Sequence, residues 1–277
     1  MTTARDNWDL PISEDQLARL TRDMEAAHRE SLPAMRAGAA DLADDVRGAS
    51  GRRAEPVDGP RDPGRRRFLV GAGGLAAATA LAACSGSGKH GSSATKGGAP
   101  SGSAGAAKGR YTGDLKVVAL AVALENQAVG AYQAALKAAK AGTLGTVPPA
   151  VATFVTTAME QHADHAKAWN SVLTGAGKPA ITGVPLSNQP ATLAALGKAR
   201  SVGDVANLAL QLEDQAAQTY LFATYSVSAE AGIATAATIA PVEAMHAAIL
   251  NFVLGKYPVP DDFLPSDKAA DPALLTI

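Results

Sequence analysis

Apolar residues recur at helical spacing along the second half of the chain, which is rich in Ala and Leu. Glycine and proline separate the apolar segments, and the short turn signals of β-hairpins are missing, so the pattern predicts helices rather than strands. Four long helices are expected: from about Asp114 to Ala141, from the pair Pro148-Pro149 to Gly175, from about Val202 to Ser226, and from about Ala229 to Lys256.

The connections between these helices predict their arrangement. Short turns join the first helix to the second and the third to the fourth, so each pair is expected to be antiparallel. The longer segment Lys178–Ser201 can cross the length of a bundle, with a short helix expected at Ala191–Lys198. Two hairpins joined by one long crossover predict an all-α, four-helix bundle over residues 111–277. Pro241, inside the fourth helix, removes one backbone donor and is expected to kink or break it, and the segment is kept as one helix with a bend.

The first 64 residues carry a weaker helical pattern. Ser13 and Gln16 have the spacing of a capping box, which predicts an amphipathic helix near residues 14–46. The apolar positions behind this prediction are Leu17, Leu20, Met24 and Ala27. Residues 1–64 are interpreted as a leader that stays cytoplasmic, contacts a partner or is removed with the signal, and an extended, weakly structured form is slightly preferred. No function is assigned to His28.

A basic cluster and an apolar run mark the middle of the chain. Residues 68–83 are apolar or small apart from Thr79, a length too short for a membrane span but suitable for an export signal. The basic cluster and the first two residues of the apolar run resemble a twin-arginine signal, in which two arginines precede a variable residue and Phe-Leu. These residues are Arg65, Arg66, Phe68 and Leu69. The twin-arginine export machinery is therefore an expected partner.

Cys84 is the only cysteine, and it follows Leu-Ala-Ala, which resembles the cleavage box of bacterial lipoproteins. The resemblance implies a lipid on Cys84 and anchoring at the outer face of the cytoplasmic membrane, in the cell envelope. Residues 65–84 then form the signal, and the Ser/Gly/Ala-rich residues 85–110 form a flexible tether in which His90 is solvated. The alternative is a buried helix with a chance cysteine.

The distribution of charge argues against a nucleic-acid partner. Residues 1–83 carry 12 Arg against 13 acidic residues, and residues 84–277 carry 13 basic against 13 acidic residues. Neither part has the basic excess that a nucleic-acid binder needs. The sequence does not decide whether the chain forms a homo-oligomer.

Two predicted helices repeat one pattern of polar residues. Residues 124–132 read LENQAVGAY and residues 212–220 read LEDQAAQTY, with Leu, Glu, Gln, Ala and Tyr at the same five offsets. In each copy the Glu and the Tyr are seven residues apart and share a helix face. Since the helices around Glu125 and Glu213 are largely apolar, both carboxylates are expected to point inward, where each needs a partner or a cation.

The other two helices carry histidines at the spacing of metal ligands. Glu243 and His246 form a Glu-x-x-His pair, whose members share one helix face. His162 and His165 form the corresponding pair on the second helix, with His162 in the place of the Glu. The neighbouring Glu160 and Asp164 are expected on an outer, polar stripe.

Together these motifs resemble the ferritin-like superfamily, whose di-iron bundles use one Glu from each of two helices and a Glu-x-x-His from each of the other two. The likeness covers about residues 111–265 and is closest to exported bacterial ferritin-like proteins, with residues 243–265 carrying much of it. It implies a ferritin-like four-helix bundle. It also implies six metal ligands, Glu125, His162, His165, Glu213, Glu243 and His246. Tyr132 and Tyr220 would lie beside the metal as hydrogen-bond donors or electron relays.

The resemblance further implies one or two ions of iron or manganese, with zinc also suited to imidazole ligands. The activity would be oxidation of Fe(II) or reduction of oxygen or peroxide outside the cytoplasmic membrane. His162 departs from the family pattern, because a neutral imidazole cannot bridge two metals as a carboxylate does. A single metal or a weaker second site would result.

Two other classes of function compete with the redox interpretation. Buried Glu, His and Tyr can satisfy one another in a bundle that has lost its metal. The chain would then be a lipid-tethered interaction or scaffold module. A hydrolase with paired carboxylates is a more distant alternative, since neither a nucleophile nor a substrate cleft can be identified in the sequence.

Overall fold

The computed structural model describes residues 9–51, 110–259 and 265–277. The proposed export signal at 65–84, with Arg65, Arg66, Phe68, Leu69 and Cys84, lies outside the described residues. The tether proposed for 85–110 does too, apart from its last residue.

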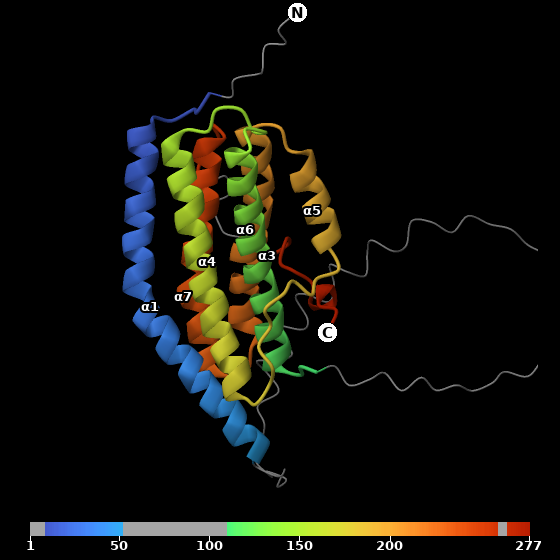
Figure 1. The fold of residues 1–277 in the computed structure, drawn as a ribbon. Coiled ribbons are helices and arrows are strands. Elements are labelled where there is room, and N and C mark those ends of the chain that lie inside the picture. Colours follow the sequence, from blue (N-terminus) through green and yellow to red (C-terminus); the bar gives the residue numbers. More distant parts are fainter. Residues whose placement is uncertain (1–8, 52–109, 260–264) are drawn as a thin grey trace, which may run out of the picture. The chain divides into compact units, whose positions relative to one another are not determined.

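Four long helices form the bundle that the sequence predicts. They are α3 (Asp114–Lys140), α4 (Pro149–Gly175), α6 (Val202–Ser226) and α7 (Glu230–Val253). The pairs α3–α4 and α6–α7 make the most extensive contacts within the bundle, as expected of two hairpins. The crossover between them carries the short helix α5 (Gln189–Lys198), which packs on α3 and α6 (Figure 1). The predicted all-α four-helix fold with a long crossover is confirmed.

Local chemistry fixes where these helices begin and end. Gly142 takes a positive φ of 71° just after α3, a conformation that favours glycine. Pro149 occupies the first turn of α4, where its missing N–H costs nothing. At the start of α6, Ser201 and Asp204 form a reciprocal capping box. These signals are readable in the sequence, which is why the predicted bounds lie within a few residues of the observed ones.

Pro241 does not break the fourth helix. α7 is one continuous helix through Pro241, so Glu243 and His246 lie on the same element. By length and composition α7 is apolar enough to cross a membrane, but more than half of its apolar window is buried inside the bundle. The buried Glu243 and His246 also argue for a core helix.

Residues 14–51 form a fifth long helix, α1 (Glu14–Gly51), which begins at the predicted Ser13–Gln16 capping box. The helix expected near residues 14–46 is therefore confirmed, and the weakly structured form preferred for this region is wrong. α1 packs against α4 and α7 and belongs to the same compact unit as the bundle. It bends partway along its length in Figure 1, and Pro33 lies inside it.

A stripe of fully buried side chains joins α1 to the bundle. The stripe includes Leu17, Met24, His28, Met35 and Leu42. Glycines let the helices approach closely, since a Cβ at Gly175 of α4 would lie 2.7 Å from the Cβ of Ala43. The pattern of apolar residues had predicted one buried face on this helix, and the surface that covers it is the α4–α7 face of the bundle.

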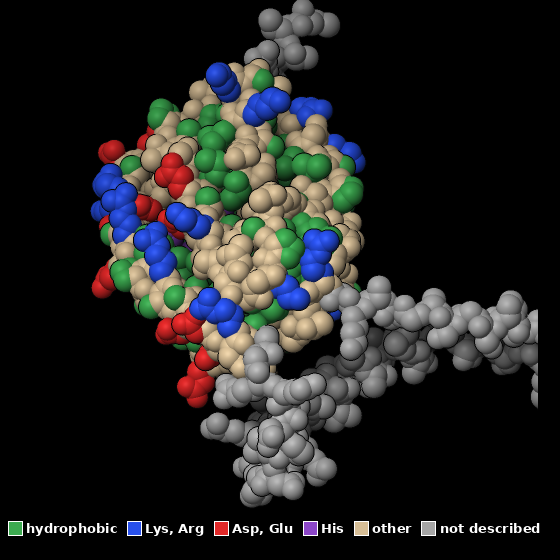
Figure 2. All heavy atoms as spheres, turned by 60° about the horizontal axis from the view of Figure 1, so that its bottom comes forward, with side chains coloured by type: hydrophobic (Ala, Val, Ile, Leu, Met, Phe, Trp, Pro, Cys, Tyr) green, Lys and Arg blue, Asp and Glu red, His purple; other side chains and the backbone are tan. Residues whose placement is uncertain are grey.

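Charged side chains of both signs are interspersed on the face of the molecule drawn in Figure 2. Neither sign forms one continuous patch there.

Candidate metal centre

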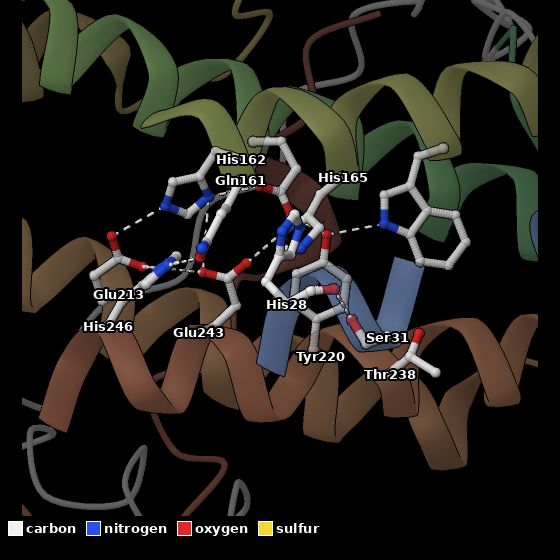
Figure 3. Close-up of polar contacts among 12 residues, drawn as sticks. His28, Ser31, Gln161, His162, His165, Glu213, Tyr220, Thr238, Glu243 and His246 are labelled. Carbon is white, nitrogen blue, oxygen red and sulfur yellow. Dashed lines mark hydrogen bonds and ion pairs between the residues drawn. The ribbon is translucent and has the colours of Figure 1, made fainter. Parts of the chain in front are cut away.

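The bundle brings all six predicted ligands together at its centre. Glu125 comes from α3, His162 and His165 from α4, Glu213 from α6, and Glu243 and His246 from α7. Each of the six is at most 2% exposed. Figure 3 labels five of them, and their side chains converge from different helices onto one small volume: His162, His165, Glu213, Glu243 and His246.

The six side chains form two overlapping groups of four. One group contains Glu125, His162, His165 and Glu243, and the other contains His162, Glu213, Glu243 and His246. Within each group one ligand atom per residue lies within 4.8 Å of all the others. His162 and Glu243 belong to both groups, so two adjacent cation positions would share these two residues.

His162 lies between the two groups with one ring nitrogen toward each. Its Nδ1 is 2.7 Å from Glu125 Oε2, and its Nε2 is 3.0 Å from Glu213 Oε1. The imidazole thus spans the place where the family pattern has a bridging carboxylate, but it presents its two nitrogens in opposite directions.

Glu243 lies between the other two histidines. Its Oε1 is 2.8 Å from His165 Nδ1, and its Oε2 is 3.2 Å from His246 Nδ1. His246 Nδ1 is also 3.2 Å from Glu213 Oε2. For both histidines Nδ1 is therefore the nitrogen that faces the carboxylates.

The two tyrosines cross over between the repeated helices. The Tyr132 hydroxyl on α3 donates to Glu213 on α6, and the Tyr220 hydroxyl on α6 donates to Glu125 on α3. Seven residues of helix rise by about 10 Å, so neither tyrosine can reach the carboxylate of its own repeat. The shared spacing of Glu and Tyr is explained by this reciprocal pairing, which ties α3 to α6 at two points.

The cluster alternates buried acids and bases, and its electrostatics follow from that. Burial alone would raise the pKa of Glu125, but His165 and His162 hold it at about 2. Burial alone would lower the pKa of His165, but Glu125 and Glu243 raise it to about 9. Burial also lowers the pKa of His162 and of His246, but the neighbouring carboxylates outweigh it and raise both pKa values. Without metal, the neighbouring carboxylates therefore favour the protonated form of all three imidazoles, and His165, with a pKa of about 9, is protonated at pH 7.

Sequence reasoning missed three residues around the cluster, and two of them lie on α1. Gln161 donates from Nε2 to Glu25 Oε2 at 2.7 Å, and its Oε1 lies 2.8 Å from His246 Nε2. His28 is 2% exposed, with its ring centroid 5.3 Å from that of His165. Burial and the neighbouring His165 lower the pKa of His28 to about 4. The available signal was the spacing from Met24 to His28, which places this histidine on the apolar stripe of α1.

Three ligand atoms in the cluster lack a hydrogen-bond partner: His165 Nδ1, His165 Nε2 and Glu243 Oε1. His165 Nδ1 and Glu243 Oε1 lie 2.8 Å apart without hydrogen-bond alignment, and neither has another hydrogen-bond partner. Buried polar atoms are normally paired, and a cation would satisfy both of these. Three carboxylates and three imidazoles form a donor set that suits iron, manganese or zinc. The residues therefore fit the metal centre that the fold implies.

A model of the ferritin-like domain family matches residues 113–256, just over half of the chain. The chain belongs to this ferritin-like family. Comparisons with curated proteins and with solved structures give no match. The matched region contains α3, α4, α6 and α7. The buried Glu/His cluster of this ferritin-like domain is compatible with metal binding.

Two small cavities reach the cluster of the ferritin-like domain between α3 and α6. Tyr132 and Glu213 line one, and Glu125 and His162 line the other. Ala128 and Leu212 line both. The small Ala128 leaves space beside the carboxylates, so this side of the bundle offers a narrow, largely apolar approach to the site.

Proposed function

We propose that this protein binds about one or two ions of iron or manganese in the Glu/His cluster and catalyses oxidation of Fe(II) or reduction of oxygen or peroxide. The observation that carries the proposal is the pair of overlapping ligand groups that share His162 and Glu243. Bound metal would supply the redox chemistry. Glu125, Glu213 and Glu243 would bind it through oxygen, and His162, His165 and His246 through nitrogen.

The surrounding residues have defined tasks in this proposal. Tyr132 and Tyr220 donate hydrogen bonds to Glu213 and Glu125, which keeps both carboxylates ionised and oriented. Trp169 in turn donates to the Tyr220 hydroxyl at 2.9 Å. The cavities between α3 and α6 give a small molecule such as oxygen or peroxide a route to the cluster.

The proposal is tested by offering Fe(II) and Mn(II) separately to the full chain carrying Cys84→Ser, which blocks lipidation. We expect elemental mass spectrometry to find about one or two metal ions per chain, and the iron-loaded protein to consume oxygen. Because ligand histidines must be neutral, binding at pH 7 should release protons, measured by calorimetry in buffers of different ionisation enthalpy. Affinity should rise with pH toward about 9, where His165 loses its proton.

Two variants serve as controls for this experiment. Glu213→Ala and His246→Ala should lose metal while helicity, followed by circular dichroism, is retained. A folded wild-type chain that takes up neither metal would overturn the redox function and leave the interaction or scaffold module as the better interpretation.

We also propose that the protein is exported by the twin-arginine route and anchored through a lipid on Cys84. The support is the sequence of residues 65–84 alone. Twin-arginine export carries folded proteins, which would allow metal to bind before translocation. In a bacterial host, wild-type chain should be found in the membrane fraction, whereas Cys84→Ser and a double Arg65→Lys, Arg66→Lys variant should not be anchored outside the cell membrane. Equal fractionation of all three would contradict the proposal.

A further inference from the structure

The helix α1 lies against the two helices that supply every predicted histidine ligand. It packs on α4 and α7, and the predicted ligands of α3 and α6 are carboxylates only. The family model begins at residue 113, so α1 is not part of the matched domain. Two polar side chains of α1, Glu25 and His28, nevertheless face the cluster (Figure 3 shows His28).

Glu25 fixes the orientation of Gln161. An ionised carboxylate can only accept hydrogen bonds, so the Gln161 amide must turn its NH₂ group toward Glu25. Its carbonyl oxygen then faces His246 Nε2 at 2.8 Å and can only accept. His246 must therefore carry a proton on Nε2, which leaves Nδ1 as the nitrogen that can bind a cation beside Glu213 and Glu243.

His28 occupies the corresponding place behind His165. The two rings meet edge to face, and Nε2 of each lacks a hydrogen-bond partner. The carboxylate contacts of His165 all involve Nδ1, so its Nε2 is the outer nitrogen. His28 Nδ1 lies 4.0 Å from Glu25 Oε2, which favours a proton on that side of the His28 ring. The His28 ring therefore contacts His165 through packing alone, and this contact limits the orientations that the His165 ring can take.

We infer that α1 completes the metal centre: Glu25, through Gln161, and His28 are positioning residues that hold His246 and His165 with Nδ1 toward the metal. The inference rests on the proposed metal binding and adds a fifth helix to it. Outer partners of metal-bound histidines orient the ring and fix which nitrogen is protonated, and their loss typically costs about 10- to 100-fold in metal affinity.

The test uses the full chain carrying Cys84→Ser and Zn(II), which is diamagnetic and suited to imidazole ligands. Glu25→Gln keeps the shape of the side chain, so the fold should be unchanged. We expect Zn(II) affinity, measured by competition with a chelator, to fall about 10- to 100-fold. Glu30→Gln removes the same charge from an exposed position of the same helix and should leave the affinity unchanged.

A second variant and a second readout separate positioning from stability. His28→Ala removes the ring that packs against His165, so Zn(II) affinity should fall in chains that circular dichroism shows to be folded. With ¹⁵N-labelled histidine, the Zn(II) form of the wild type should show His246 bound through Nδ1 and protonated on Nε2. Glu25→Gln should shift the His246 Nε2–H signal, whereas Glu30→Gln should not.

The outcomes distinguish this inference from the proposed function. A wild-type chain that binds no Zn(II), iron or manganese overturns both. A wild type that binds Zn(II), with equal affinity and an unchanged His246 Nε2–H signal in Glu25→Gln, overturns only the role of α1.

Discussion

Replacing Glu243 with Gln should weaken metal binding at both positions, whereas Glu125→Gln or Glu213→Gln should weaken it at one. Glu243 is the only carboxylate common to the two ligand groups of the described residues. Its two oxygens face different histidines, His165 and His246. Gln keeps the size of the side chain but replaces one of these oxygens by an NH₂ group that cannot bind a cation.

Metal content per chain is the measurement, with helicity as the control for folding. Removing one member of a buried ion pair can lower the free energy of unfolding by about 3–5 kcal/mol. In Glu243→Gln the loss of stability should be smaller, because the neighbouring imidazoles can release their protons. A Glu243→Gln chain that still holds as much metal as Glu125→Gln would show that the two groups do not share this carboxylate.

Replacing Leu42 with Asp should detach the C-terminal half of α1 from the bundle. Leu42 is fully buried, and its side chain packs over Gly232 at the start of α7. Truncating a buried leucine to alanine already costs about 2–5 kcal/mol of stability, and burying a carboxylate among the apolar side chains there adds to that loss. We expect destabilisation of about 4 kcal/mol or more, measured by urea unfolding, and rapid proteolysis within α1.

Leu193→Asp is the matched control. Leu193 lies on α5 and is 51% exposed, so the same substitution there should change stability by less than about 0.5 kcal/mol. If α1 in the Leu42→Asp chain resists protease as well as it does in wild type, the packing of α1 on the bundle does not depend on this stripe.

The bundle could be predicted from the sequence because its signals are local. Helix starts and ends are marked by Pro149, the Ser201–Asp204 box and Gly142, and loop lengths set the pairing of helices. The six candidate ligands could be found because Glu-x-x-His and the repeated Glu-to-Tyr spacing each place two side chains on one helix face. Their convergence required only that four amphipathic helices share one core.

Relations between distant segments could not be predicted in the same way. The amphipathic pattern of residues 14–46 indicates a buried face on a helix, but nothing in that pattern identifies the α4–α7 face as its cover. The contact from Glu25 to Gln161 spans 136 residues of sequence, and no spacing rule connects them. The crossed pairing of the tyrosines was missed for a similar reason, since periodicity describes one helix at a time.

The position of α1 ahead of Cys84 has a consequence if the proposed lipoprotein cleavage takes place. A cut before Cys84 would leave all six ligands on one fragment, and Glu25 and His28 on another. The single chain would become a two-chain complex, in which α1 is a dissociable subunit whose occupancy depends on its concentration. Dilution, or separation of the two fragments by the membrane, would then remove the outer partners of His246 and His165 without any change in the ligands themselves.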